Sequence, residues 1–190
     1  QQMGGPKGYL ITANNDVGSL SYDNSLANDI SYVGGPYTPG LRAENITQGM
    51  TELLQGKKAD VASMAKLQSR HKSVLAQVLL PFLLATLDKA NKLLDTKPSW
   101  TDEQKAMMAV YEANTAQFKK VEARLKSWQS RGLWAESGVK TFYHTPTSEQ
   151  VDDSIATMIF SSWTRHLVQE IFADEKVGFA WELRETDKVI

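Results

Sequence analysis

Helical periodicity from Leu41 onward is the feature that most constrains the fold. In residues 41–56, LRAENITQGMTELLQG, apolar side chains recur at steps of three and four: Ile46, Met50, Leu53 and Leu54. This spacing puts them on one face of an amphipathic helix, and Gly56 suits its C-cap. Similar spacing continues through most of the remaining chain. The sequence therefore predicts a mainly α fold with one or two short strands.

Three further helical stretches carry signals at their first residues. Asp60 can cap a helix in ADVASMAKLQ, because an N-cap side chain accepts hydrogen bonds from free backbone N–H groups. Thr101 precedes two acidic residues, which favours a helix start there and a helix over residues 101–128. Thr147 and Gln150 have the spacing of a capping box for a last helix.

A fourth stretch, HKSVLAQVLLPFLLATLDKANKLL, contains the longest apolar run, residues 74–87. That run includes a Gln and a Pro and is shorter than the roughly 20 residues of a membrane-spanning helix. A helix with this many apolar residues must be covered by other parts of the protein on most of its sides. The stretch therefore predicts a buried core helix and no membrane span. Pro81 either kinks this helix or starts a new segment.

The chain before Leu41 has a different pattern. Residues 9–13, YLITA, are β-branched and aromatic and predict one short strand. Two adjacent asparagines, Asn14 and Asn15, follow it. The next stretch, residues 16–41, is rich in glycine and proline: Gly18, Gly34, Gly35, Pro36, Pro39 and Gly40. It predicts a long irregular loop, and such loops are usually functional.

Composition excludes several classes of function. Hydrophobic residues make up 42% and charged residues 23%, which is ordinary usage for one globular domain. A net charge of −1 without basic clusters argues against a nucleic-acid partner. The lack of cysteine excludes disulfides, thiolate metal sites and cysteine nucleophiles. The opening residues QQMGG lack the features of a signal peptide, so we expect a processed product or a cut-out segment.

The residues that most often carry chemistry have structural explanations here. His71, His144 and His166 lie far apart without metal-ligand spacing, so we expect structural or exposed roles for them. Asp152 and Asp153 are expected in the first turn of a helix, where the helix dipole favours negative charge.

Residues 129–147 interrupt the helical pattern and predict a small hairpin or loop. Three tryptophans, Trp128, Trp134 and Trp163, bracket this interruption and are expected to pack a core. The sequence contains no phosphate-binding loop, dinucleotide fingerprint or nucleophile elbow. These patterns alone predict a mainly helical globular unit and go no further toward function.

The stretch GYLITANND, residues 8–16, resembles the penicillin amidase family of N-terminal nucleophile hydrolases, which includes acyl-homoserine lactone acylases. In that family a strand ending in N-N is followed by an acidic loop, then G-G, an arginine and an amphipathic helix. The same elements follow in order here: Gly8, Tyr9, Asn14, Asn15, Asp29, Gly34, Gly35 and Arg42. Weaker matches in VLLPFLLATL, RLKSWQSRG and IATMIFSSWTRHL extend the resemblance over nearly the whole chain.

The resemblance implies an amide hydrolase with an αββα fold, of which this chain is a mainly helical segment. Family members use a serine at the N-terminus of the large subunit, with its own α-amine as the base. This chain begins with Gln1, so we expect it to lack the nucleophile and to be inactive alone. Residues 1–41 would supply a strand and active-site loop, and residues 42–190 a helical region, of one partial domain.

The resemblance also implies three site residues. Asn14 matches the family asparagine whose side-chain N–H donates to the tetrahedral oxyanion, and Arg42 matches an arginine that holds neighbouring groups in place. Asp29 resembles a calcium ligand of better-known members, which makes calcium a candidate cofactor of the intact parent. An oxygen-only calcium site needs about six to eight ligands, so no cofactor is expected in this segment alone.

Partners and compartment follow from the same resemblance. It implies a small-molecule amide substrate, the remainder of the acylase chains as partners, and a periplasmic or secreted location. A homo-oligomer of the fragment is a further option. The alternative is a non-catalytic helical binding or scaffold module, in which Asn14 and Asn15 only form a turn.

Overall fold

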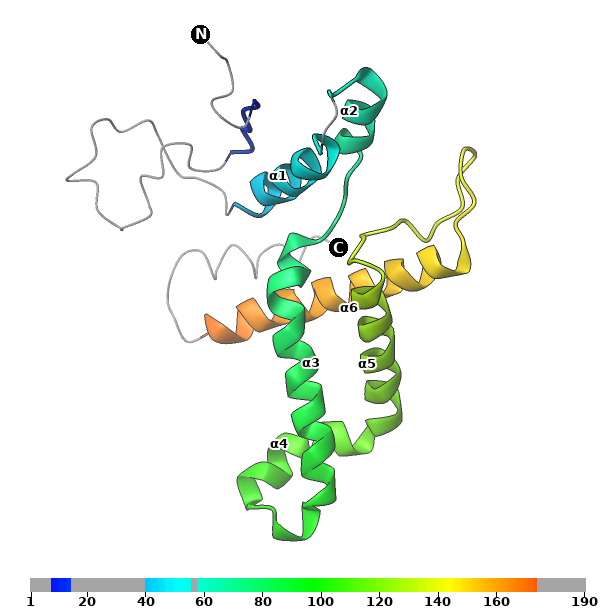
Figure 1. Cartoon of the computed structure of the whole chain (residues 1–190). Coiled ribbons are helices and arrows are strands. Elements are labelled where there is room, and N and C mark those ends of the chain that lie inside the picture. The colour runs from blue at the N-terminus through cyan, green and yellow to red at the C-terminus, as the bar shows by residue number, and fades with distance from the viewer. Residues whose placement is uncertain (1–7, 15–39, 56–57, 174–190) are drawn as a thin grey trace, which may run out of the picture. The chain divides into compact units, whose positions relative to one another are not determined.

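The computed structural model describes residues 8–14, 40–55 and 58–173 of the chain. Its described part is mainly helical, as the periodicity predicts, and the helices are labelled in Figure 1. The chain divides into two compact units, residues 1–75 and residues 76–190. The domain division expected from the sequence stays a prediction.

The first unit holds α1 (Leu41–Leu53) and α2 (Val61–Gln68). Asp60 caps α2 as predicted: its carboxylate accepts from Ser63 N at 2.7 Å, and its own N–H donates to Ser63 Oγ at 2.9 Å. By contrast, Gly40 is the N-cap of α1 and has no side-chain hydrogen bond to offer. The predicted C-cap, Gly56, lies outside the described residues.

The short strand predicted at residues 9–13 is not formed, and the described residues contain no β-strand. A strand is stable only when a neighbouring strand pairs with its N–H and C=O groups. No such neighbour exists in the described part of the chain, so these residues run as irregular chain. The mainly α class is therefore confirmed without this strand, and most of the predicted loop at 16–41 lies outside the described residues.

The second unit contains α3, whose first two residues lie before the unit boundary, followed by a short 3-10 helix and three more helices. Their bounds are α3 Val74–Asp95, η2 Lys97–Ser99, α4 Asp102–Ala113, α5 Thr115–Ser130 and α6 Ser148–Ile171. Thr101 and Thr147 cap α4 and α6 through the expected capping boxes.

The stretch 101–128, predicted as one helix, is two helices. Asn114 separates them: its φ of −124° is not helical, and its side-chain Nδ2 donates to Val110 O at 2.9 Å. Asparagine offers the backbone this local alternative to a helical hydrogen bond, which explains the break.

The apolar helix α3 continues through Pro81, so the predicted alternative of a new segment at this residue is wrong. Leu80 and Leu87 are buried, whereas Val78 and Phe82 are exposed. The predicted core role therefore holds for one face of α3 and not for the other. Among the described helices, α3 is long and apolar enough to cross a membrane by length and composition, a test that soluble core helices also pass.

In the second unit α5 and α6 pack against each other (Figure 1), and their buried residues form a core together with buried residues of α3 and α4. Trp128 of α5 is fully buried, and its ring lies 5.8 Å from that of Phe160 on α6. Its Nε1 donates to Trp134 O at 2.8 Å, which fastens the following loop to α5. The predicted core role is confirmed for Trp128, while Trp134 and Trp163 are only half-buried.

A polar chain ties α3, α4 and α5 together. Tyr111 Oη donates to Asn91 Oδ1 at 2.8 Å, and Asn91 Nδ2 donates to Glu122 Oε2 at 2.9 Å. Glu122 also accepts from Lys126 Nζ at 2.5 Å. Burial raises the pKa of Tyr111 above its usual value, with the charge of Glu122 adding to the effect. Tyr111 therefore remains a neutral hydrogen-bond donor.

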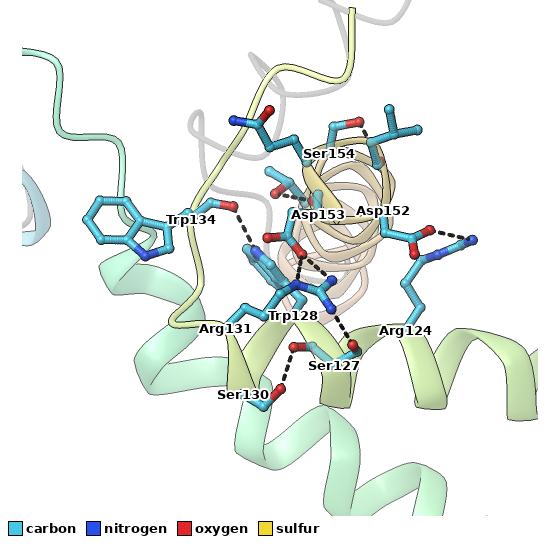
Figure 2. Close-up of polar contacts among 12 residues, drawn as sticks. Arg124, Ser127, Trp128, Ser130, Arg131, Trp134, Asp152, Asp153 and Ser154 are labelled. Carbon is cyan, nitrogen blue, oxygen red and sulfur yellow. Dashed lines mark hydrogen bonds and ion pairs between the residues drawn. The ribbon is translucent and has the colours of Figure 1, made fainter. Parts of the chain in front are cut away.

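The carboxylates Asp152 and Asp153 join α6 to α5 (Figure 2). Asp153 accepts from Arg131 Nε at 2.9 Å and also from Nη2, while Asp152 accepts from Arg124 Nη2 at 3.1 Å. The expected first-turn role is wrong, because α6 begins at Ser148 and both residues lie one turn further on. They form ion pairs between the two helices.

We expect Asp153→Ala to lower the free energy of unfolding by roughly 3 kcal/mol, because it leaves a partly buried guanidinium without its partner. The Asp153 side chain is only 6% exposed and that of Arg131 26%. The matched control is Asp152→Ala, whose carboxylate is 51% exposed and should contribute about 1 kcal/mol or less. Urea unfolding of the chain measures both, and equal losses would contradict this difference.

Candidate active site

Two of the three predicted site residues meet in the first unit. Arg42, in the first turn of α1, donates from Nη1 to Asn14 Oδ1 at 3.3 Å. The third residue, Asp29, lies outside the described residues, so its calcium role stays a prediction. In the ranges that the structure describes, no group of three or more His, Asp or Glu side chains could hold a metal ion.

The contact fixes the orientation of the Asn14 side chain. Arginine can only donate hydrogen bonds, so the carboxamide oxygen must face Arg42 and the Nδ2 group must turn to the other side. The backbone of Asn14 has a φ of +60°, a left-handed conformation that asparagine tolerates better than most residues. Backbone and guanidinium together therefore set the direction in which Nδ2 points.

The position of Arg42 is not explained by the stability of α1. The N-terminal end of a helix carries partial positive charge, which disfavours a cation in the first turn. No ion pair to Arg42 occurs among the described residues; its hydrogen bond goes to the neutral side chain of Asn14. The hydrogen bond to Asn14 is thus the contact that explains where the Arg42 guanidinium lies, and its effect is to orient the Asn14 carboxamide.

A groove of about 880 Å³ lies between α1 and α2, and Arg42 forms part of its lining. Apolar side chains line much of the rest, including Ile46, Met64 and Leu67. This volume is in the range of pockets that hold small organic molecules. The groove therefore offers an apolar surface next to Arg42, against which an apolar group of a bound ligand can pack.

Sequence reasoning missed Arg70, which also lines the groove. Its side chain is only 9% exposed and forms an ion pair with Glu52 of α1, with Nη1 to Oε2 at 2.7 Å and Nη2 to Oε1 at 3.0 Å. The sequence does contain a pattern that could have indicated this contact. One face of α1 carries, at helical spacing, Arg42, Asn45, Gly49 and Glu52. Polar residues and a glycine on such a face indicate a closely packed polar contact.

The ion pair makes a pH-dependent contribution to stability. The hydrogen bond from Arg70 holds the pKa of Glu52 below its ordinary value of 4.5. A carboxyl whose pKa is lower in the folded state adds stability above its unfolded-state value and loses it as the pH falls through the folded-state value.

We therefore expect Glu52→Gln to destabilise the chain near neutral pH. The difference from the unmodified chain should begin to shrink as the pH falls below about 4.5, the unfolded-state value, and should vanish only below the lowered folded-state pKa of Glu52. Comparing urea midpoints of the two proteins from neutral to acidic pH isolates this carboxyl from the others. A difference between them that stays constant down to the lowest pH would contradict the expectation.

Comparison with protein families adds an independent finding. The family model for penicillin amidase matches residues 1–189, a span that includes Asn14, Arg42 and all the helices described above. Searches of curated proteins and of solved structures returned no significant match. On the family match over nearly its whole length, the chain belongs to the penicillin amidase family.

Proposed function

We propose that this chain is the part of a penicillin-amidase-type acylase that carries the oxyanion donor, with Asn14 as that donor and Arg42 as the residue that orients it. The observation that carries the proposal is the hydrogen bond from Arg42 to Asn14 Oδ1. It turns the N–H groups of the carboxamide away from the guanidinium, which is the orientation that a donor to a third group requires.

In amide hydrolysis, such a hydrogen-bond donor would stabilise the negative charge that forms during the reaction. When a nucleophile adds to the amide carbon, negative charge develops on the carbonyl oxygen. A preorganised N–H aimed at that oxygen lowers the barrier by about 2.7–4 kcal/mol. The positive charge of Arg42 behind the carboxamide polarises it further, which strengthens the donor.

The nucleophile in this proposal is the N-terminal serine that the family uses, contributed by sequence outside these 190 residues. Its Oγ gives up its proton to the α-amine of the same serine and forms a bond to the amide carbon; the C–N bond then breaks, and the amine leaves with that proton. Water then cleaves the resulting ester, which releases the carboxylic acid and restores the serine. Asn14 would stabilise the tetrahedral oxyanion in both halves of the reaction.

Family membership also supports proposals about the intact parent. Calcium would bind at Asp29 with further oxygen ligands from elsewhere, and a chelator should then lower the melting temperature of the parent. The parent would act in the periplasm or outside the cell, which fractionation of the producing cells tests. The rest of the acylase would be the partner of this segment.

The assay that tests the function is release of a primary amine by the intact enzyme from a panel of amides. The panel contains penicillins, acyl-homoserine lactones and simple N-acyl anilides, because the described residues favour none of these substrates. Hydrolysis that depends on Asn14 supports the proposal. Hydrolysis that is unaffected by Asn14→Ala would leave the helical binding module as the better description of this segment.

A further inference from the structure

Within the described part of the chain, the first turn of α1 has no side-chain cap. Its N-cap, Gly40, makes no side-chain hydrogen bond to the free N–H groups of the helix. An uncapped helix end depends on packing to hold its first residues in place. Arg42 lies in this turn, so the position of its guanidinium depends on what holds the body of α1.

Arg70 contacts the body of α1 through hydrogen bonds and an ion pair. Its Nε donates to Asn45 Oδ1 at 2.9 Å, one turn after Arg42, and its two terminal nitrogens bind both carboxylate oxygens of Glu52. Asn45 returns a hydrogen bond from Nδ2 to Arg70 O at 3.4 Å. The planar guanidinium therefore fixes α1 at two points, and a lysine could not reproduce this geometry.

Gly49 makes room for the Arg70 side chain. A Cβ at this position would lie 2.3 Å from Leu67 Cδ1 and 2.9 Å from Arg70 Cδ. Both distances are far below van der Waals contact, so any larger residue forces these side chains to move. The close approach of α1 to the end of α2 thus depends on the absence of a side chain at Gly49.

We propose that Arg70 is a positioning residue for the oxyanion donor: by holding Asn45 and Glu52 it fixes α1, and through α1 it sets the Arg42 guanidinium against Asn14. The inference rests on the proposed function, because it concerns the same site. The contacts that carry this role are those of Arg70 with Asn45 and Glu52, so in this proposal Arg70 acts on the oxyanion donor through α1 and Arg42.

A double-mutant cycle in the intact enzyme tests this role. Arg70→Lys keeps the charge but loses the Nε contact to Asn45, and it should lower kcat roughly tenfold with KM unchanged, since small misplacements of a catalytic group have large effects on rate. In an Asn14→Ala background the same substitution should lower kcat no further, because the group that it positions is already gone.

Two more variants separate positioning from general loss of stability. Gly49→Ala displaces Arg70 without removing any polar group. The crowding also costs some stability, so kcat is measured well below the melting temperature of the variant, where the chain is folded and kcat should still fall. Arg124→Lys is the matched control, since Arg124 lies in the second unit and its ion pair with Asp152 is exposed. Its kcat should be normal.

The outcomes distinguish the two proposals. A normal kcat for Arg70→Lys, or an equal loss in both backgrounds, overturns the positioning role and leaves the proposed function standing. A normal kcat for Asn14→Ala overturns the proposed function and the positioning role with it. A loss for Arg70→Lys that disappears in the Asn14→Ala background supports both.

Discussion

Replacing Asn14 by alanine should lower kcat of the intact enzyme by about 10²–10³-fold while KM stays near its normal value. The carboxamide would contribute a hydrogen bond that strengthens only when charge develops on the substrate oxygen. Such an interaction appears in kcat and kcat/KM equally and leaves ground-state binding unchanged. Steady-state hydrolysis of the best amide in the panel measures both constants.

The adjacent residue provides a matched control for this substitution. Asn15→Ala removes the same kind of side chain one position later, where the sequence predicts only the start of a loop, and it should retain most of the activity. Asn14→Asp keeps the shape of the side chain but replaces N–H donors with a charged oxygen, so it should be at least as inactive as Asn14→Ala. Comparable losses for Asn14→Ala and Asn15→Ala would point to a disturbed loop instead of a lost donor.

Trp128→Ala should lower the free energy of unfolding by about 3–5 kcal/mol, because it empties a large site in a closely packed core. Trp128 is fully buried between α5 and α6, and its Nε1 is also lost as the donor to Trp134 O. That carbonyl would then lose a hydrogen bond in a part-buried position. Urea unfolding followed by far-ultraviolet circular dichroism measures the loss.

Two variants apportion this loss. Trp128→Phe keeps a ring in the core but removes the hydrogen-bond donor, so it should account for about 1–3 kcal/mol of the effect. Phe142→Ala removes an aromatic ring that is 95% exposed, and it should change stability by no more than about 0.5 kcal/mol. A loss for Phe142→Ala as large as that for Trp128→Ala would mean that the α5–α6 core is not where the stability lies.

Local signals predicted the helix starts well. Asp60, Thr101 and Thr147 each begin a helix with a reciprocal capping box, because capping depends on residues three positions apart and needs nothing from the rest of the fold. The break at Asn114 escaped prediction, since the same residue type can point to solvent in a continuous helix.

The sequence predicted less about interactions between elements. Asp152 and Asp153 were explained by the helix dipole, whereas their partners Arg124 and Arg131 lie more than 20 positions away in the chain. The short strand at residues 9–13 failed for a related reason, because local propensity cannot supply the neighbouring strand on which pairing depends.

At the candidate site, the family motif identified Asn14 and Arg42, and the structure places them in contact. No motif identified Arg70, although its partners Asn45 and Glu52 share one face of α1 with Arg42. A positioning residue makes contact with the protein and not with the substrate, so its pattern looks like ordinary helix packing until the partners are seen together.

The most direct test of an oxyanion role for Asn14 is the affinity of a tetrahedral transition-state analogue. A boronic acid matched to the best amide substrate would be measured as an inhibitor of the intact enzyme and of Asn14→Ala. A donor to the oxyanion favours the tetrahedral state over the ground state, so the inhibition constant should rise by about the same factor as kcat falls, with KM changing less than about twofold. An inhibition constant that does not change, or one that changes only in proportion to KM, would contradict the assignment of Asn14 as the oxyanion donor.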